Sequence, residues 1–238
     1  MTRVIVSRDK LVAIANAIRS KSETTDALTL DEMPSAVEGI QAGGGSCDYA
    51  AEDGLISGEI SAYRNDRITN VWEYSFYQHS ALVSVDLPNV TNIGQYAFYK
   101  SVNLESVNFP NLITLGTQSL RMCTALKSVN FPYITGTLWS YMLDGCTSLE
   151  RADFGQLDAV GSNSMNGCSS LHTVILRRTN KIASLQGTTA LRGTLIEAGT
   201  GYVYVPRDLV DSYKVASNWT TYADQIRAIE DYPEITGG

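Results

Sequence analysis

The 238-residue sequence has no long apolar run and offers little support for export or membrane insertion. No segment approaches the roughly 18 apolar residues that a membrane-spanning helix needs. The first ten residues, MTRVIVSRDK, hold only a three-residue apolar stretch. A signal peptide needs an apolar core of about 7–15 residues. We therefore expect no membrane insertion, and either a leader that has been removed or assembly in the cytoplasm.

The sequence also lacks an excess of positive charge. Its formal net charge is −7, and its 18 lysines and arginines are scattered. Binding to a nucleic-acid backbone or an anionic membrane needs a basic patch. We therefore expect no nucleic-acid partner.

Residues typical of active sites are scarce. There are two histidines and four cysteines, and no phosphate-binding glycine loop, zinc-ligand spacing or EF-hand loop. Both histidines, His79 and His172, fall on positions of an internal repeat, described next. The sequence predicts no enzyme and no cofactor.

What the chain does contain is an internal repeat with a short and nearly constant period. Five leucines mark it, one in each copy: Leu82, Leu104, Leu126, Leu149 and Leu171. A weaker copy lies upstream, around Ile60 and Tyr63. Segments such as SVDLP and SVNFP follow each leucine and alternate apolar with polar residues. A constant period carried by apolar positions predicts a solenoid whose strands stack into a parallel sheet.

The repeat has a recognisable pattern, I-x-x-I-G-x-x-A-F-x-x-C-x-x-L-x-x-V-x-[FL]-P, matched best by residues 90–110 and 112–132. It resembles the BspA-type (Treponema-type) leucine-rich repeats of bacterial surface proteins and phages. The resemblance covers about residues 60–206 and implies an α/β solenoid that acts as a recognition scaffold.

Three of the cysteines share one slot of the repeat. Cys123, Cys146 and Cys168 each lie three residues before the marker leucine, where earlier coils have His79 and Ser101. Side chains stacked in parallel do not converge on a metal, whose ligands must meet at about 2.3 Å. We expect inert buried thiols, and no metal site. Cys47, beside a glycine-rich segment, is expected to be exposed.

Two sets of side chains are candidates for ligand binding. The first is a polar stripe on the outer side of the strands, either a solvated surface or a binding face: Asp86, Asn108, Asn130 and Asp153. The second departs from the repeat, because Trp72 and Trp139 fill a slot that other coils give to Gly94, Gly116 and Gly161. A glycine slot indicates a tight turn near the surface. Nearby aromatic residues could add flat stacking surfaces: Tyr74, Tyr96, Tyr99 and Tyr141. The alternative is that the indole rings pack over a neighbouring coil.

The N-terminal residues do not follow the repeat. Apolar stripes predict helices over residues 9–22 and 31–40, with these members: Leu11, Ile14, Ile18, Met33, Val37 and Ile40. The segment resembles the start of phage and prophage structural proteins, where a short helical segment precedes a glycine-rich linker. It is either a hairpin folded on the first coil or an attachment and oligomerisation module.

The C-terminal residues resemble the usual ending of the repeat family. We expect a last strand at residues 202–206 and a helix over residues 208–216. Trp219, Tyr222 and Ile226 would then cover the open end of the core. Residues 177–200 break the register and predict a long loop or irregular coil.

These observations predict four parts: a helical module (1–42), a glycine-rich linker (43–48), a repeat domain (49–206) and a cap (207–238). The first functional hypothesis is a phage or prophage virion component, such as a tail, baseplate or head fibre. Its N-terminal helices would bind other virion proteins or form a homo-oligomer, preferably a trimer, and its repeats would bind a host surface glycan or protein. The alternative is a bacterial cell-surface adhesin. A third hypothesis is an assembly factor without a receptor.

Overall fold

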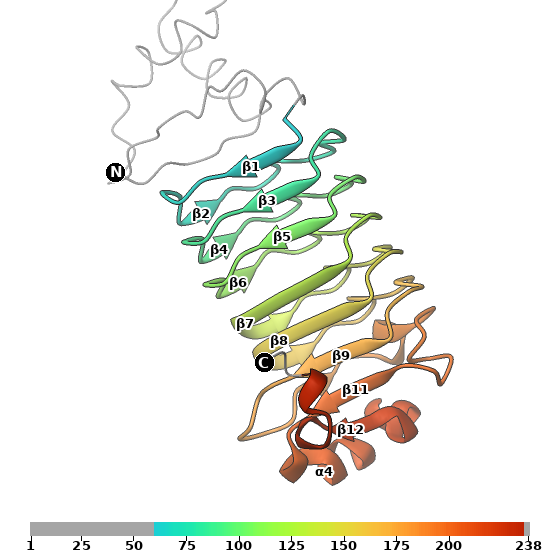
Figure 1. Ribbon diagram of the computed structural model, residues 1–238. Coiled ribbons are helices and arrows are strands. Elements are labelled where there is room, and N and C mark those ends of the chain that lie inside the picture. Colours follow the sequence, from blue (N-terminus) through green and yellow to red (C-terminus); the bar gives the residue numbers. More distant parts are fainter. Residues whose placement is uncertain (1–59, 236–238) are drawn as a thin grey trace, which may run out of the picture.

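The alternating segments of the sequence form the strands of a stack of coils. The computed structural model describes residues 60–235 (Figure 1). The first strand position of the coils is taken by β1 (Ala62–Arg64), β3 (Ser84–Asp86), β5 (Ser106–Asn108), β9 (Thr173–Leu176) and β11 (Tyr202–Val205). The second is taken by β2 (Asn70–Val71), β4 (Asn92–Ile93), β6 (Thr114–Leu115) and β10 (Ser184–Leu185). The long strands β7 (Ser128–Leu138) and β8 (Arg151–Val160) run through both positions.

Equivalent residues of neighbouring coils pair directly. β1 aligns with β3 and β3 with β5, in parallel, so that Val85 lies opposite Tyr63 and Val107. This is the register that the spacing of the leucines predicted, and it confirms the solenoid. The second sheet, β2-β4-β6, repeats the same register.

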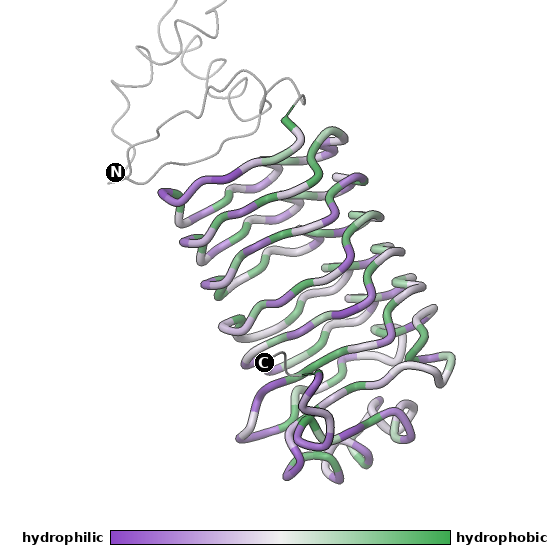
Figure 2. The backbone as a smooth tube through the Cα atoms, in the orientation of Figure 1, coloured by the Kyte–Doolittle hydropathy of each residue, from purple (hydrophilic) through white to green (hydrophobic). Residues whose placement is uncertain are grey.

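The interior is a ladder of identical positions. All five marker leucines are fully buried. Aromatic rings continue the ladder, with ring centroids of Phe76 and Phe98 4.8 Å apart and those of Phe109 and Phe131 6.3 Å apart. Hydrophobic and hydrophilic stretches therefore recur at the same place in successive coils (Figure 2).

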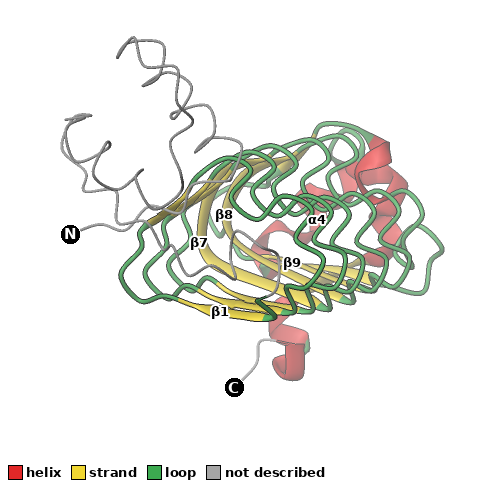
Figure 3. Cartoon of the chain, turned by 90° about the horizontal axis from the view of Figure 1, so that it is seen from above, coloured by secondary structure: helices red, strands yellow, loops and turns green. Residues whose placement is uncertain are grey.

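The coils contain turns where an α/β solenoid would have helices (Figure 3). Within residues 60–206 of the described part, the helical segment is the 3-10 turn η1 (Thr188–Leu191). The reason is local, since each regular coil has two positions with positive φ, such as Tyr96 and Lys100 in one coil. A right-handed helix cannot continue through such residues. The repeats therefore consist of strands and turns, and the α-helix of the described residues, α4 (Val210–Val215), follows them, within the helix predicted over residues 208–216.

The end of the chain extends the sheet by one more strand than expected. After η2 (Arg207–Leu209), α4 (Val210–Val215) and η3 (Trp219–Gln225), strand β12 (Ile226–Ala228) pairs with β11. Tyr213 and Trp219 are buried with their ring centroids 5.3 Å apart. The Trp219 indole donates to the Ala183 carbonyl oxygen at 2.8 Å, and the Tyr213 hydroxyl accepts from the Ala183 amide at 2.8 Å.

The last described residues, η4 (Ile229–Asp231) and η5 (Pro233–Ile235), cover the outer side of the C-terminal strands. Ile229 packs with Ile175 and Tyr204 in a second small core. As a result all four residues of β9 are buried. The sheet thus has an open outer side on its N-terminal strands and a covered one at its C-terminal end.

This cover corrects the predicted polar stripe. Asn108 and Asn130 are exposed, and Asn108 donates to Asp86 Oδ1 at 2.8 Å. Asp153 is buried instead, at 1% exposure. Arg177 binds both of its carboxylate oxygens at 2.7 Å, and Arg151 binds Oδ2 at 2.9 Å and also the Ile235 carbonyl. Asp153 is therefore a structural ion-pair centre and not a member of a solvent-facing stripe.

The N-terminal predictions lie outside the described residues. This applies to both expected helices, with Leu11, Ile14, Ile18, Met33, Val37 and Ile40, and to Cys47.

We predict that Asp153→Asn lowers the free energy of unfolding by about 3 kcal/mol, because it leaves two guanidinium groups without their buried charge partner. Asp86→Asn is the matched control. Asp86 lies in the same slot on the open side and pairs with the exposed Arg64, so its loss should cost less than about 1 kcal/mol. Denaturant unfolding of both variants would measure this, and equal effects would contradict it.

Candidate recognition surface

Each regular coil turns back from its second strand through a segment with a fixed backbone. The first positive-φ position of this turn holds Tyr74, Tyr96, Gln118, Tyr141 and Asn163 in successive coils. Main-chain bonds join the turns of neighbouring coils, such as Tyr74 N to Gln95 O and Tyr96 N to Thr117 O, both 3.1 Å. The backbone conformation is therefore set by the stack and not by the side chain.

Tyrosine is a poor residue for this conformation. A left-handed φ costs a non-glycine residue roughly 1 kcal/mol, and asparagine and glycine tolerate it best. The coil at Asn163 uses such a residue, with φ of 57°. Tyr74, Tyr96 and Tyr141 adopt φ of 61°, 54° and 61°. Three tyrosines with a strained backbone in one slot, all of them at least partly accessible to solvent, indicate that their side chains have a role.

Four tyrosines pack together on this side of the stack. We call Tyr74, Tyr77, Tyr96 and Tyr99 the tyrosine face. Ring centroids lie 5.1 Å apart for Tyr74 and Tyr96 and 5.3 Å apart for Tyr77 and Tyr99, with both pairs stacked. Tyr77 was not among the residues singled out from the sequence, although it holds the same repeat position as Tyr99 in the preceding coil and could have been found by the same alignment.

Stacking changes what the tyrosine face can offer to a ligand. Because the rings of neighbouring coils cover one another, the faces between them are occupied, and ring edges and hydroxyl groups remain for a partner. Burial, and then Tyr96, raises the pKa of Tyr74, so this hydroxyl stays a neutral donor and acceptor. The ring faces between Tyr74 and Tyr96 and between Tyr77 and Tyr99 are therefore not available as flat stacking surfaces for a ligand.

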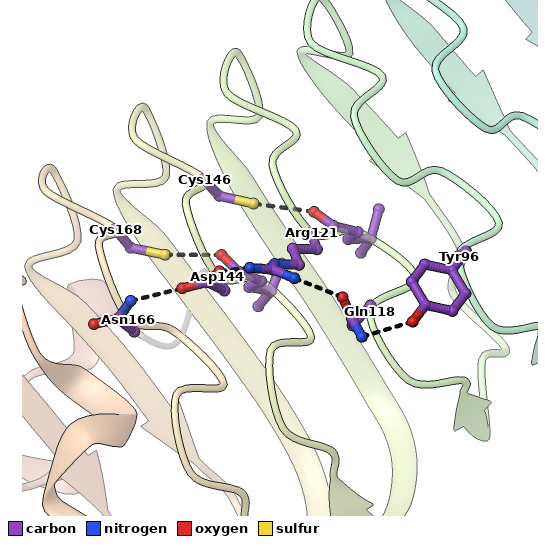
Figure 4. A network of polar contacts seen from close by, with 9 residues as sticks. Tyr96, Gln118, Arg121, Asp144, Cys146, Asn166 and Cys168 are labelled. Atoms are coloured by element: carbon purple, nitrogen blue, oxygen red, sulfur yellow. Dashed lines mark hydrogen bonds and ion pairs between the residues drawn. The ribbon is translucent and has the colours of Figure 1, made fainter.

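Arg121 connects the tyrosine face to Tyr141. Its guanidinium carbon lies 5.9 Å from the Tyr99 ring centroid and 4.9 Å from that of Tyr141. Arg121 is held by Asp144 Oδ2 at 2.8 Å and by Gln118 Oε1 at 2.7 Å, and Gln118 donates to the Tyr96 hydroxyl at 2.8 Å (Figure 4). The cation is thus positioned across two coils.

Both tryptophans are exposed, Trp72 by 46% and Trp139 by 53%. The glycines that fill this slot in other coils do not have positive φ. A Cβ on Gly94 would lie 2.5 Å from the Glu73 amide nitrogen, and one on Gly116 would lie 2.5 Å from that of Gln95. Glycine is required there by the close approach of the preceding coil.

A bulge in β7 explains how the glycine slot accommodates the large side chain of Trp139. The pairing of β7 with β8 shifts register on either side of Gly136, where φ is 74°. In other coils the amide of the glycine slot bonds to the preceding coil, as from Gly116 to Ile93 O at 2.7 Å and from Gly161 to Leu138 O at 2.7 Å. Among the described residues no such bond from Trp139 is present, and the second sheet is interrupted between β6 and β7. The bulge therefore makes room for an outward indole.

The cysteine ladder of the described residues is structural. No group of three or more His, Cys, Asp or Glu side chains gathers there to hold a metal ion. Cys123, Cys146 and Cys168 are fully buried, and each thiol donates to a carbonyl oxygen of the preceding coil at 3.1 Å. Ser101 makes the equivalent bond to Phe76 O at 2.7 Å. None of the helices in residues 60–235 has the length and apolar character needed to span a bilayer.

We predict that these three thiols stay unreactive until the protein unfolds. Burial raises the pKa of Cys123 to about 12, whereas an unfolded thiol ionises near about 8.5. The stability that this burial contributes is complete below about pH 8.5 and is lost as the pH rises towards about 12. A Cys47→Ser variant should show no reaction with DTNB at about pH 8 except at the rate of global unfolding. Rapid modification of the folded variant would contradict this.

Comparison with known proteins identifies the repeat. A family model for the BspA type leucine rich repeat region matches residues 64–187 in six copies. No curated protein sequence matches the chain.

Solved structures that resemble it include a leucine rich repeat protein of T. pallidum, with 18% identity, a TM-score of 0.44, and coverage of 65% of this chain and 82% of that one. The pneumococcal vaccine antigen PcpA has 13% identity and a TM-score of 0.42, with 71% and 40% covered. A leucine rich cell surface protein from Faecalibacterium prausnitzii has 17% identity and a TM-score of 0.36, with 51% and 48% covered. The chain spans less than half of the last two proteins.

The family match covers just over half of the chain, and its copies coincide with the stacked coils from β1 to β10. The chain therefore belongs to the BspA-type leucine-rich repeat family.

Proposed function

We propose that the chain is a non-enzymatic recognition module of a bacterial cell-surface protein, which binds a host surface glycan or protein. The observation that carries this proposal is the set of tyrosines held at positive φ in three coils, of which Tyr74 and Tyr141 are exposed and Tyr96 is half-buried. A stack needs no aromatic side chain there, since Asn163 fills the same slot.

The chemistry of this side of the stack suits adhesion. Tyrosine, tryptophan and arginine dominate the energetics of protein interfaces. Here the tyrosine face, Arg121 and Tyr141 form one connected set, and Arg121 is fixed by Asp144 before any partner arrives. Preorganised groups lose less conformational entropy on binding. The surface therefore has the rigidity that a binding face requires.

Family membership favours the cell-surface alternative over the virion component. BspA-type repeats occur in bacterial surface proteins. The family match lends no support to a place in a phage particle.

The first test removes the aromatic side chains that the fold does not need. Trp72→Ala with Trp139→Ala, and separately Tyr141→Gly, should lower attachment to host cells by about ten-fold or more, as loss of interface hot spots does. The free energy of unfolding should change by less than about 1 kcal/mol for Tyr141→Gly, because relief of the left-handed strain offsets the lost contact with Arg121.

Thermal unfolding of the same variants is the control. A large loss of stability with unchanged attachment would show that these side chains are structural and would refute the proposal. Val215→Ala, which alters the most exposed large apolar side chain of α4, should change neither property.

We further propose that residues 1–46 mediate self-association, with a trimer preferred. The full chain should have the mass of a trimer by light scattering, and the chain from residue 47 onward should have that of a monomer. A monomeric full-length chain would exclude self-association through these residues.

A further inference from the structure

A groove follows the corner between the two strand positions of the first four described coils. Its volume is about 760 Å³, within the range of ligand sites. We call it the corner groove, and its lining residues are Asp66, Arg67, Thr69, Asn89, Thr91, Asn111, Ile113, Tyr133 and Thr135. No residue of the tyrosine face lines it, so the two surfaces are separate.

The lining repeats from coil to coil. One slot holds Arg67, Asn89, Asn111 and Tyr133, and another holds Thr69, Thr91, Ile113 and Thr135. The Asn89 amide group donates to Asp66 O at 2.6 Å and that of Asn111 to Pro88 O at 2.8 Å. These bonds fix both amides and leave their carbonyl oxygens as acceptors. The groove therefore presents oriented polar groups at the spacing of the coils.

Two neighbouring departures from the repeat add apolar surface. Ile113 replaces threonine and is 42% exposed, and Tyr133 replaces asparagine and is 60% exposed. They lie beside the β7 bulge, whose register shift begins between Phe131 and Thr135. Bulges commonly occur next to functional sites. The C-terminal end of the groove thus has an apolar platform beside a polar track.

We propose that the corner groove binds a neutral, straight oligosaccharide that lies along the axis of the solenoid. A pyranose ring has an apolar face, which suits Tyr133 and Ile113, and equatorial hydroxyl groups, which suit amides and threonines. Equatorially linked sugar rings advance by nearly the distance between neighbouring strands, about 4.8 Å, and successive rings are turned over relative to one another. One ring can then lie over each of four coils.

The groove fits other polymers less well. Its charged lining residues, Asp66 and Arg67, are adjacent and opposite in sign, so it lacks the cationic track that a polyanion needs. An extended peptide advances about 3.3 Å per residue, which does not match the spacing of the coils. A neutral glycan is the occupant that agrees with both the charge and the repeat.

The test measures binding of cellohexaose, chitohexaose and mannohexaose to the full chain by calorimetry. At least one should bind, and its affinity should rise with chain length up to four rings, one for each coil. Tyr133→Asn and Ile113→Thr restore the residues of neighbouring coils, so both variants should fold normally. Each should weaken binding of that sugar by about ten-fold, as expected for the loss of one stacking contact.

The control is Val215→Ala, which alters an exposed apolar side chain outside both the groove and the tyrosine face and should leave sugar binding unchanged. The proposal is overturned if no oligosaccharide binds at millimolar concentration, if Tyr133→Asn binds like the parent chain, or if Val215→Ala weakens binding equally. Failure of the proposed function gives a different result. In that case the Trp72 and Trp139 variant attaches to cells normally, while Tyr133→Asn still loses its affinity for the sugar.

Discussion

The structure depends on main-chain bonding between equivalent residues of neighbouring coils. Parallel pairing, as between Val85 and Val107, holds the coils at the spacing of strands and forces every side chain to stack on its counterpart in the next coil. The same closeness explains why Gly94 and Gly116 tolerate no Cβ, and why the thiols of Cys123 and Cys146 reach only carbonyl oxygens of the preceding coil. Interior and exterior are therefore both periodic.

What is periodic could be predicted from the sequence. The positions of Leu82 and its counterparts, the burial of Cys123 and the parallel register follow from spacing alone, because each observation is repeated several times. The exposure of Trp72 and Trp139 was predicted from the glycine slot, and the structure adds the physical cause of that slot, which is a close approach between neighbouring coils. The positive φ of Tyr74 and Tyr96 could not be predicted from the sequence, because tyrosine is not a residue typical of that backbone conformation.

What is not periodic could not be predicted. Asp153 holds the same repeat position as Asp86 and Asn108. It is nevertheless covered by a segment near the end of the described chain, where Arg151 donates a hydrogen bond to the Ile235 carbonyl oxygen. A contact of this kind depends on where the chain end folds back, and repeat spacing holds no information on that. The corner groove escaped notice for a related reason, because it is made by slots that look like ordinary turn residues until the coils are stacked.

The cover over the C-terminal strands also limits where a long ligand can lie. The outer side of the sheet is open at Asp86, Asn108 and Asn130 but closed from Asp153 onward. The corner groove ends at Thr135, and the tyrosine face and the bulged coil with Trp139 occupy the same N-terminal coils. Because the outer side of the sheet is covered at its C-terminal strands, the exposed departures from the repeat described above lie on the first four described coils.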